Sequence, residues 1–324
     1  MKNPTMFAIL KASLAALSMC GAAAQNYPSK PVRLVVPFPA GGSTDIVGRI
    51  VGQKLGESLG HQVIIDNRGG AGGTIGSDLV AKSAPDGYTL LLGTSSTHSI
   101  APSLYAKLSY DPVKDFAPVT LICTATILLA LHPSVPANTV KELIALAKKH
   151  PRELSFASGG NGSISHLVGE QFKAMAGVDM IHVPYKGDTP ALVDLVSGQV
   201  SLEFGTAVAF LPYVKSGKLK ALAVTNPKRS AIVPSVPTVT ESGLPGFEAL
   251  QWFGVFAPAA TPKEIIARLH SDIVKALQNP DVRDKFVALG TDIVAGPPEQ
   301  FAAFQKSEIA KWAKVVKQSG ARVD

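Results

Sequence analysis

The sequence predicts an α/β protein with two lobes, and three observations support this fold class. Strand-like and helix-like segments alternate over most of the 324 residues, a pattern typical of sheets covered by helices. This length is enough for about two domains, each with its own hydrophobic core. Two long apolar runs, 121–131 and 251–257, interrupt the alternation, and we expect them to carry the chain between the lobes. The alternative is two independent domains with an ordinary linker, although the polar stretch typical of one is absent.

Residues 1–24 differ in composition from the rest of the chain and predict a secretory signal peptide. They combine basic residues, a short apolar run and the small residues Ala22–Ala24, which suit cleavage before Gln25. The apolar run is shorter than the roughly 20 residues that a membrane-spanning helix needs. We therefore expect an exported protein that is soluble after cleavage. A retained apolar helix and a lipid anchor on Cys20 are the alternatives, and the bulky Met19 disfavours the anchor.

The first lobe is expected to comprise residues 27–122 and 255–324. The continuous apolar run 32–36 suits a strand that is buried on both faces. In 44–59 the apolar residues recur at helical spacing, and a Pro-Asp-Gly turn precedes the strand 88–92. A further strand is expected at 62–65, and further helices at 74–83, 262–278, 281–288 and 298–318.

The second lobe is expected at residues 128–248, between crossings at 123–127 and 249–254. The same alternation predicts strands at 154–157, 180–183, 200–204 and 219–224, and helices at 139–149, 164–176, 188–197 and 210–215. Because strands joined through helices usually lie parallel, we expect parallel sheets. A hinge of two extended crossings leaves a cleft between the lobes, and such clefts commonly hold small ligands.

Composition excludes several classes of protein. With 46% hydrophobic and 17% charged residues, the chain is not disordered. Two cysteines rule out a disulfide scaffold, and Cys123 lies in an apolar stretch where we expect a small buried side chain. The seven histidines form no metal-binding spacing, so we expect neither metal nor cofactor. The net charge of +7 is spread over helix faces without interleaved aromatics, which argues against nucleic-acid binding.

Two glycine-rich loops are the strongest functional signal. They span 37–45 (PFPAGGSTD) and 158–166 (SGGNGSISH), and each follows a predicted strand and opens a helix. The first N–H groups of a helix have no internal partner, and the helix dipole favours an anion there. Glycine lets a ligand approach the backbone, and the Ser43 and Ser163 hydroxyls add polar groups. We expect the pair to hold a carboxylate from opposite sides; the alternative is two tight turns that only cap helices.

The loops do not match the known nucleotide-binding patterns. Neither has the G-x-G-x-x-G spacing, and the chain contains no G-x-x-x-x-G-K-[ST] motif. The third glycine-rich segment, 68–76, also misses the dinucleotide spacing, so we expect it to shape a turn or to line the floor of the cleft.

Two charged or titratable residues in the loops have competing interpretations. Asp45 either caps its helix and pairs with Arg49, or attracts the ammonium group of an amino-acid ligand. His166 lies beside Ser163 and Ser165, so a nucleophilic serine is conceivable. The sequence shows neither an orienting acid in a suitable place nor a G-x-S-x-G motif. For His166 we therefore favour ligand contact, capping or packing over catalysis.

Six stretches together resemble one known family. They are PFPAGGSTD (37–45), GGAGGTIG (69–76), PDGYTL (85–90), VPYKG with PALVDLVSGQV (183–187, 190–200), VPTVTESGLPGF (236–247) and WFGVFAPAATP (252–262). Over nearly its whole length beyond the signal peptide, the chain resembles the periplasmic solute-binding proteins of tripartite tricarboxylate transporters, the TctC or Bug family. The resemblance implies a type II Venus flytrap fold, with two crossing strands as hinge. It also implies a carboxylated ligand between the lobes.

The resemblance assigns site residues position by position. In lobe one the implied ligand contacts are Ala40, Gly41, Gly42, Ser43 and Asp45, and in lobe two Gly162, Ser163 and His166. The implied flanking residues are Thr94, Ser95, Ser96, Gly205, Thr206 and Ala207. Phe38, Ser165 and Tyr185, which lie in or near the loops, complete the expected site. The chain departs from the family pattern at Gly70, Ser201 and Ala260, outside the two loops.

These observations lead to one preferred function. We expect a non-catalytic, monomeric periplasmic receptor that binds a dicarboxylate, tricarboxylate, acidic amino acid or aromatic acid and delivers it to a membrane permease. The alternatives are a secreted hydrolase or transferase that uses Ser163 or Ser165 with His166, and a sensory binding protein without transport.

Overall fold

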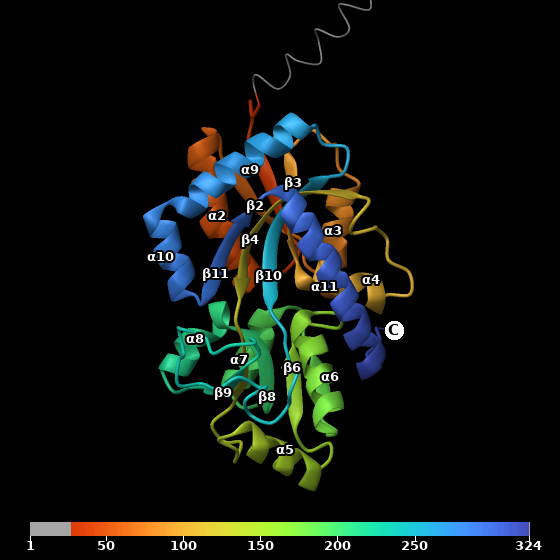
Figure 1. Cartoon of the computed structure of the whole chain (residues 1–324), viewed down its shortest axis with the longest axis vertical. Coiled ribbons are helices and arrows are strands. Elements are labelled where there is room, and N and C mark those ends of the chain that lie inside the picture. The colour runs from red at the N-terminus through yellow and green to blue at the C-terminus, as the bar shows by residue number, and fades with distance from the viewer. Residues whose placement is uncertain (1–26, 324) are drawn as a thin grey trace, which may run out of the picture.

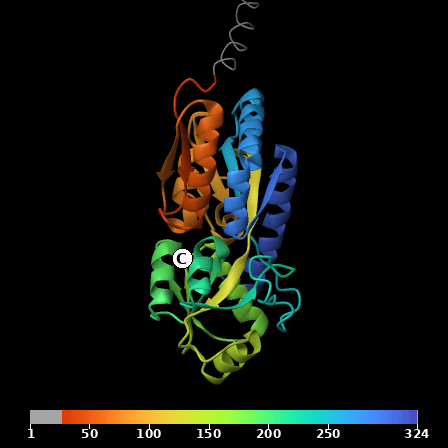
Figure 2. The ribbon, with the colours of Figure 1, turned by 90° about the vertical axis from the view of Figure 1, so that its left-hand side faces the viewer.

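The computed structural model describes residues 27–323 and has two α/β lobes, each built around one sheet (Figures 1 and 2). The first sheet has six strands in the order β11-β4-β10-β3-β1-β2, and the second has five in the order β7-β6-β8-β5-β9. The predicted signal peptide, its cleavage site and Cys20 lie outside the described residues.

Lobe one contains the six-stranded sheet and the helices that cover it. Its strands are β1 (Val32–Val36), β2 (Val63–Asn67), β3 (Thr89–Thr94), β4 (Phe116–Ala125), β10 (Gln251–Pro258) and β11 (Thr291–Gly296). Its helices are α2 (Ser43–Leu59), α3 (Thr74–Ala81), α4 (Ala101–Leu104), α9 (Lys263–Gln278), α10 (Pro280–Ala288) and α11 (Pro298–Ser319), with the short turns η1 (Ala71–Gly73) and η2 (Ser96–Ile100).

Lobe two is the smaller unit. Its strands are β5 (Ile127–Leu131), β6 (Ser155–Ser158), β7 (Ile181–Pro184), β8 (Leu202–Thr206) and β9 (Lys220–Val224). Its helices are α5 (Val140–Lys149), α6 (Ile164–Ala176), α7 (Asp188–Val196) and α8 (Ala207–Lys215).

The prediction of purely parallel sheets is wrong for the strands next to the crossings. In lobe one, β2, β1 and β3 are parallel, but β10 is antiparallel to β3 and β4, and β11 is antiparallel to β4. In lobe two, β5 is antiparallel to both β8 and β9. The physical reason is that β5 and β10 enter their sheets directly from the other lobe. They need no crossover helix, which parallel neighbours require.

The chain passes between the sheets twice. Only Thr126 separates β4 in the first sheet from β5 in the second. The return segment leaves β9, and near its end the Ala249 N–H donates to the Thr225 carbonyl before β10 begins at Gln251. Cys123 on β4 is free and fully buried, as predicted, and desolvation raises the pKa of its thiol well above the ordinary value.

Helix α11 adds a contact between the lobes that the sequence does not predict. It packs against β4, η2 and α4 of lobe one and also against α6 of lobe two. Its Trp312 is fully buried in a cluster that consists mostly of lobe-two side chains. The sequence assigns residues 255–324 to lobe one, so this helix reaches beyond its expected partner.

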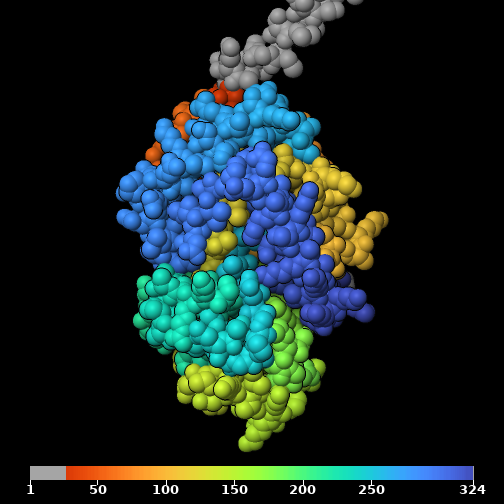
Figure 3. Space-filling model, viewed as in Figure 1, coloured from red at the N-terminus to blue at the C-terminus, as the bar shows by residue number. Residues whose placement is uncertain are grey.

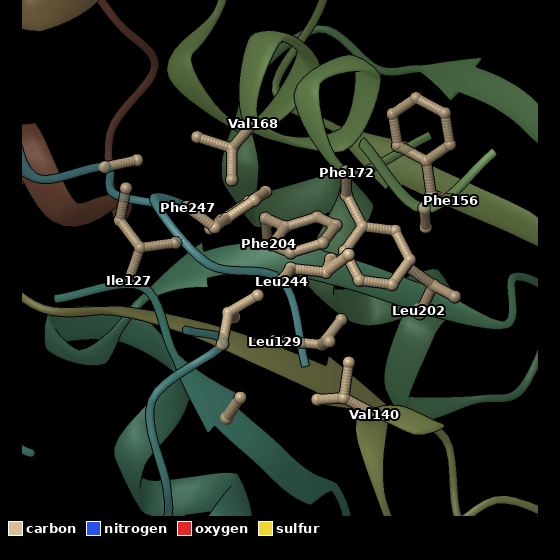
Figure 4. Close-up of a cluster of buried hydrophobic side chains, with 14 of the residues drawn as sticks. Ile127, Leu129, Val140, Phe156, Val168, Phe172, Leu202, Phe204, Leu244 and Phe247 are labelled. Atoms are coloured by element: carbon tan, nitrogen blue, oxygen red, sulfur yellow. The ribbon is translucent and has the colours of Figure 1, made fainter. Parts of the chain in front are cut away.

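The core of lobe two contains packed aromatic rings between β8 and α6 (Figure 4). The ring centroids of Phe204 and Phe172 lie 5.5 Å apart, and those of Phe204 and Phe247 lie 6.3 Å apart. Phe204 and Leu202 on β8 point to this side of the sheet. Glu203 between them points to the opposite side because side chains alternate along a strand.

We expect Phe204→Ala to lower the free energy of unfolding by about 3–5 kcal/mol, because it leaves a cavity among buried rings. Denaturant unfolding followed by circular dichroism measures the change. Val287→Ala on α10 is the control: Val287 is 63% exposed, so its truncation should change stability by less than about 0.5 kcal/mol. Equal effects of the two substitutions would contradict the assignment of this core.

Candidate functional site

The first glycine-rich loop connects β1 to α2, and its polar groups are fixed by the protein itself. Gly42 is the N-cap of α2, and Gly41 has φ +83°, a conformation that favours glycine. Asp45 Oδ2 accepts hydrogen bonds from the Gly41 N–H (2.9 Å) and from Arg49 Nε (2.8 Å), and Oδ1 accepts one from the Asn67 amide (3.0 Å). Although desolvation opposes it, these bonds hold the pKa of Asp45 below its ordinary value. The geometry thus favours the capping interpretation of Asp45 over contact with a ligand ammonium.

The second loop connects β6 to α6 and is equally well ordered by internal hydrogen bonds. Ser163 is the N-cap of α6, and its hydroxyl accepts the His166 N–H (3.3 Å). The Gly162 N–H donates to His166 Nδ1 (3.2 Å), and the Gly159 N–H donates to Ser165 Oγ (3.0 Å). Within residues 27–323, His166 makes no hydrogen bond to a serine hydroxyl or a carboxylate through its ring, so a catalytic triad is not assembled.

His166 stacks on His182, which the sequence does not single out. The two ring centroids are 4.2 Å apart and the planes differ by 12°. His182 Nε2 lies 2.6 Å from Ser158 Oγ. Desolvation, assisted by Lys173, lowers the pKa of His166 to about 4. Desolvation, together with His166 and Lys173, lowers the pKa of His182 to about 3. Both rings are therefore neutral at neutral pH.

The two loops meet the opposite lobe directly, and the lobes touch closely in the space-filling view (Figure 3). The hydroxyl of Ser43 in lobe one is hydrogen-bonded to that of Thr206 in lobe two. The Ile164 N–H at the start of α6 donates to Ser96 Oγ in lobe one (2.9 Å). Ser43, Thr206 and Ser96, all expected site residues, thus lie where the lobes join.

The larger of two cavities between the lobes has a volume of about 680 Å³. Tyr105 beside it donates to the Ala71 carbonyl (2.8 Å), and its hydroxyl lies 3.5 Å from the Asn161 carbonyl in lobe two. Its lining residues are Phe38, Pro39, Gly69, Gly70, Ala71, Gly72, Gly73, Tyr105, Gly159, Gly160, Asn161, Pro184, Tyr185, Lys186, Gly187 and Val323. The third glycine-rich segment therefore lines this cavity, as one of its two interpretations predicts.

The smaller cavity, about 190 Å³, lies between α2 and the helices α7 and α8. Gly41 and Gly42 line it together with Asp188 and Thr189. The first loop thus borders both cavities, because Phe38 and Pro39 line the larger one together with Gly159 and Gly160 of the second loop. Gly41 and Gly42 face this smaller one, whereas Phe38 and Tyr185 line the larger one.

The predicted flanking residues lie at the chain crossings. Ser95 Oγ donates to Gln251 Oε1 (2.6 Å) at the start of β10, and the Ala207 N–H donates to the Thr126 carbonyl (2.8 Å). Thr94 and Gly205 are fully buried, and the Phe210 ring occupies the space beside Gly205. These residues connect the site to the hinge.

Asp188 is a site residue that sequence reasoning missed. It begins α7, and its Cβ lies 3.9 Å from the position that a Cβ on Gly42 would take. A Cβ on Gly159 would clash with the Asp188 carboxylate, so this carboxylate lies against both glycine-rich loops. Desolvation, opposed by a hydrogen bond with Ser43, raises the pKa of Asp188 to about 6. The signal in the sequence that could have found Asp188 was its position directly after Gly187, at the start of a predicted helix.

Glu203 on β8 is the second missed residue. It is fully buried, and neither of its carboxylate oxygens has a hydrogen-bond partner among the described residues. Desolvation, followed by the charge of Asp188, raises its pKa well above the ordinary value. A charged residue between Leu202 and Phe204 in an apolar strand was the signal that could have found it.

Residues 27–323 contain neither a clustered metal site nor a helix suited to span a membrane. This part of the chain contains no group of three or more His, Cys, Asp or Glu residues arranged to hold a metal ion. None of its helices combines the length and apolar character needed to cross a bilayer.

Comparison with known proteins places the chain in a family. The model of the tripartite tricarboxylate transporter family receptor, TctC, matches residues 47–321. Protein BugT of Bordetella pertussis is 41% identical over 301 residues, which cover 93% of this chain and 92% of that protein.

Solved structures agree with the assignment and with the predicted two-lobed fold. An R. palustris protein solved with adipate has a TM-score of 0.89 and 38% identity, and the match covers 92% of this chain and all of that one (100%). MatC from Rhodopseudomonas palustris with bound malate has a TM-score of 0.87 and 38% identity, over 90% of this chain and 100% of that one. The predicted family and fold class are confirmed: this chain belongs to the TctC family of periplasmic solute-binding receptors.

Proposed function

We propose that this chain binds a small carboxylated solute between its lobes and delivers it to a membrane permease. The family consists of solute receptors, and two relatives of known structure were solved with the dicarboxylates adipate and malate. The observation that carries the proposal is that two glycine-rich loops, each opening a helix, come from different lobes and meet the opposite lobe.

The loops supply the groups that a carboxylate needs. The first N–H groups of α2 and α6 have no partner within their helices, and both helix dipoles favour negative charge at these ends. Gly41 and Gly162 both have φ +83°, a conformation that glycine adopts without strain, and neither adds a side chain where the lobes meet. A hydrogen bond to a charged group contributes about 1.5–3 kcal/mol, so a few of them suffice for micromolar binding.

The same geometry argues against the hydrolase alternative. Ser163 Oγ lies 3.0 Å from Ser165 Oγ and accepts a backbone N–H, and His166 Nδ1 is occupied by the Gly162 N–H. A serine nucleophile needs a base within hydrogen-bond reach of its hydroxyl, and neither serine has such an imidazole contact in the described part of the chain.

Titration calorimetry against di- and tricarboxylates, acidic amino acids and aromatic acids tests the proposed function. We expect one-to-one binding at micromolar or tighter affinity, with the ligand recovered unchanged by mass spectrometry. Turnover of any bound acid would support an enzyme instead, and failure of every carboxylate to bind would overturn the proposal.

We expect Gly41→Val to weaken ligand binding by at least about 2 kcal/mol, roughly thirtyfold. A valine at φ +83° strains the turn, and its side chain would grow from a position 3.6 Å from Thr189 Oγ1 at the lobe contact. Gly60→Val is the matched control, since Gly60 ends the same helix at φ +70° with open space around it. It should cost stability without loss of affinity. Equal affinities of the two folded variants would refute a binding role for Gly41.

We expect the stacked histidines to make the protein less stable in acid. An unfolded histidine has a pKa near 6.5, whereas His166 and His182 titrate at about 4 and about 3 when folded. Between these values the unfolded state binds protons that the folded state does not. The stability that these two histidines contribute is therefore complete above pH 6.5 and falls as the pH drops toward 4.

The measurement is the melting temperature from pH 7.5 to pH 4.5. His182→Phe keeps an aromatic ring in the stack and should flatten the decline relative to the unmodified protein. His61→Gln removes a histidine outside the stack that makes no ion pair among residues 27–323, and it should leave the profile unchanged. Identical profiles for all three proteins would contradict the assignment.

A further inference from the structure

Asp188 lies at the meeting point of the two loops without a counterion among the described residues, and the buried Glu203 lies behind it. Among residues 27–323, no salt bridge involves either side chain. The basic residue that serves the nearby first loop, Arg49, is already paired with Asp45. Carboxylates removed from water without a partner are costly, and native proteins normally pair them.

Asp188 is directed toward the cleft. Asp188 lines the smaller interlobe cavity beside Gly41 and Gly42, and its carboxylate lies against Gly159 of the second loop. Glu203 lies behind it, on the strand that ends at Thr206, where the lobes touch. Glu203 is fully buried, and neither of its carboxylate oxygens has a hydrogen-bond partner among the described residues.

A ligand that carries only carboxylates does not suit this environment. It would bring more negative charge against the half-buried Asp188, where like charges repel more strongly than in open water. An ammonium group supplies the opposite charge and three hydrogen-bond donors for the Asp188 carboxylate. The glycine-rich loops, at the starts of α2 and α6, would hold the carboxylate of the same molecule.

We infer that the ligand of this receptor carries a cationic amino group in addition to its carboxylate, and that Asp188, with Glu203 behind it, recognises this group. The inference rests on the proposed function and narrows it. This chain should select amino acids over the corresponding acids that lack the amine, in contrast to the adipate and malate held by the two solved relatives.

Matched pairs of ligands test the inference by titration calorimetry at pH 7.5, on the chain without its predicted signal peptide. The pairs are L-aspartate with succinate, L-glutamate with glutarate, and L-alanine with propionate. In at least one pair we expect the amino acid to bind tenfold more tightly or better, the size expected of one charge-assisted hydrogen bond.

Asp188→Asn should reduce that preference to less than about threefold, because it weakens the binding of the amino acid and leaves that of the amine-free acid unchanged. Asp179→Asn, which removes an exposed carboxylate of the same lobe, should leave the preference unchanged. If Asp188→Asn fails to fold, Asp188→Ser removes the same charge at the start of α7 with a smaller side chain and should lower the preference in the same direction.

The outcomes separate the two proposals. If the two members bind equally well in every pair, or if Asp188→Asn keeps the preference, the inference is overturned while carboxylate binding stands. If no acid of either kind binds, the proposed function fails and the inference falls with it.

Discussion

The double passage of the chain between the two sheets is the constraint on which the site depends. Because β4 continues into β5 after a single residue and β10 returns beside β4, the lobes are joined through interior strands of both sheets. The loops after β1 and β6 then lie on opposite sides of the contact between the lobes, and Ser43 reaches Thr206. Neither loop alone distinguishes a binding site from a capped helix. Their opposition, fixed by the crossings, is what favours a shared site.

The internal hydrogen bonds of the loops divide their residues into two roles. Asp45 is occupied by Gly41, Arg49 and Asn67, so it stiffens the first loop. His166 holds Gly162 in the same manner in the second. Asp188 is the acidic group at this contact with no basic partner among the described residues, which gives the cleft an electrostatic character that the loops alone do not have.

Much of the fold could be predicted because its signals are local. Helix α6 begins and ends where the sequence predicts, since Ser163 caps its start and Gly177 ends it in a left-handed conformation. Strand β11 was missed because it is a partly exposed edge strand without a continuous apolar run. The antiparallel placement of β5 and β10 depends on which lobe the chain has just left. Asp188 and Glu203 escaped notice because the lack of a basic partner for one and the complete burial of the other are visible only in three dimensions.

Helix α11 limits how such a molecule can open. Since it packs on β4 and on α6, and buries Trp312 in a cluster dominated by lobe two, it ties the lobes together at a place separate from the strand crossings. Separating the lobes by a straight translation would break the buried contacts of the Trp312 indole, whereas a rotation about an axis that passes near α11 would preserve them. Entry and exit of the solute are then best pictured as rotation of one lobe against the other, with the C-terminal helix acting as a strap.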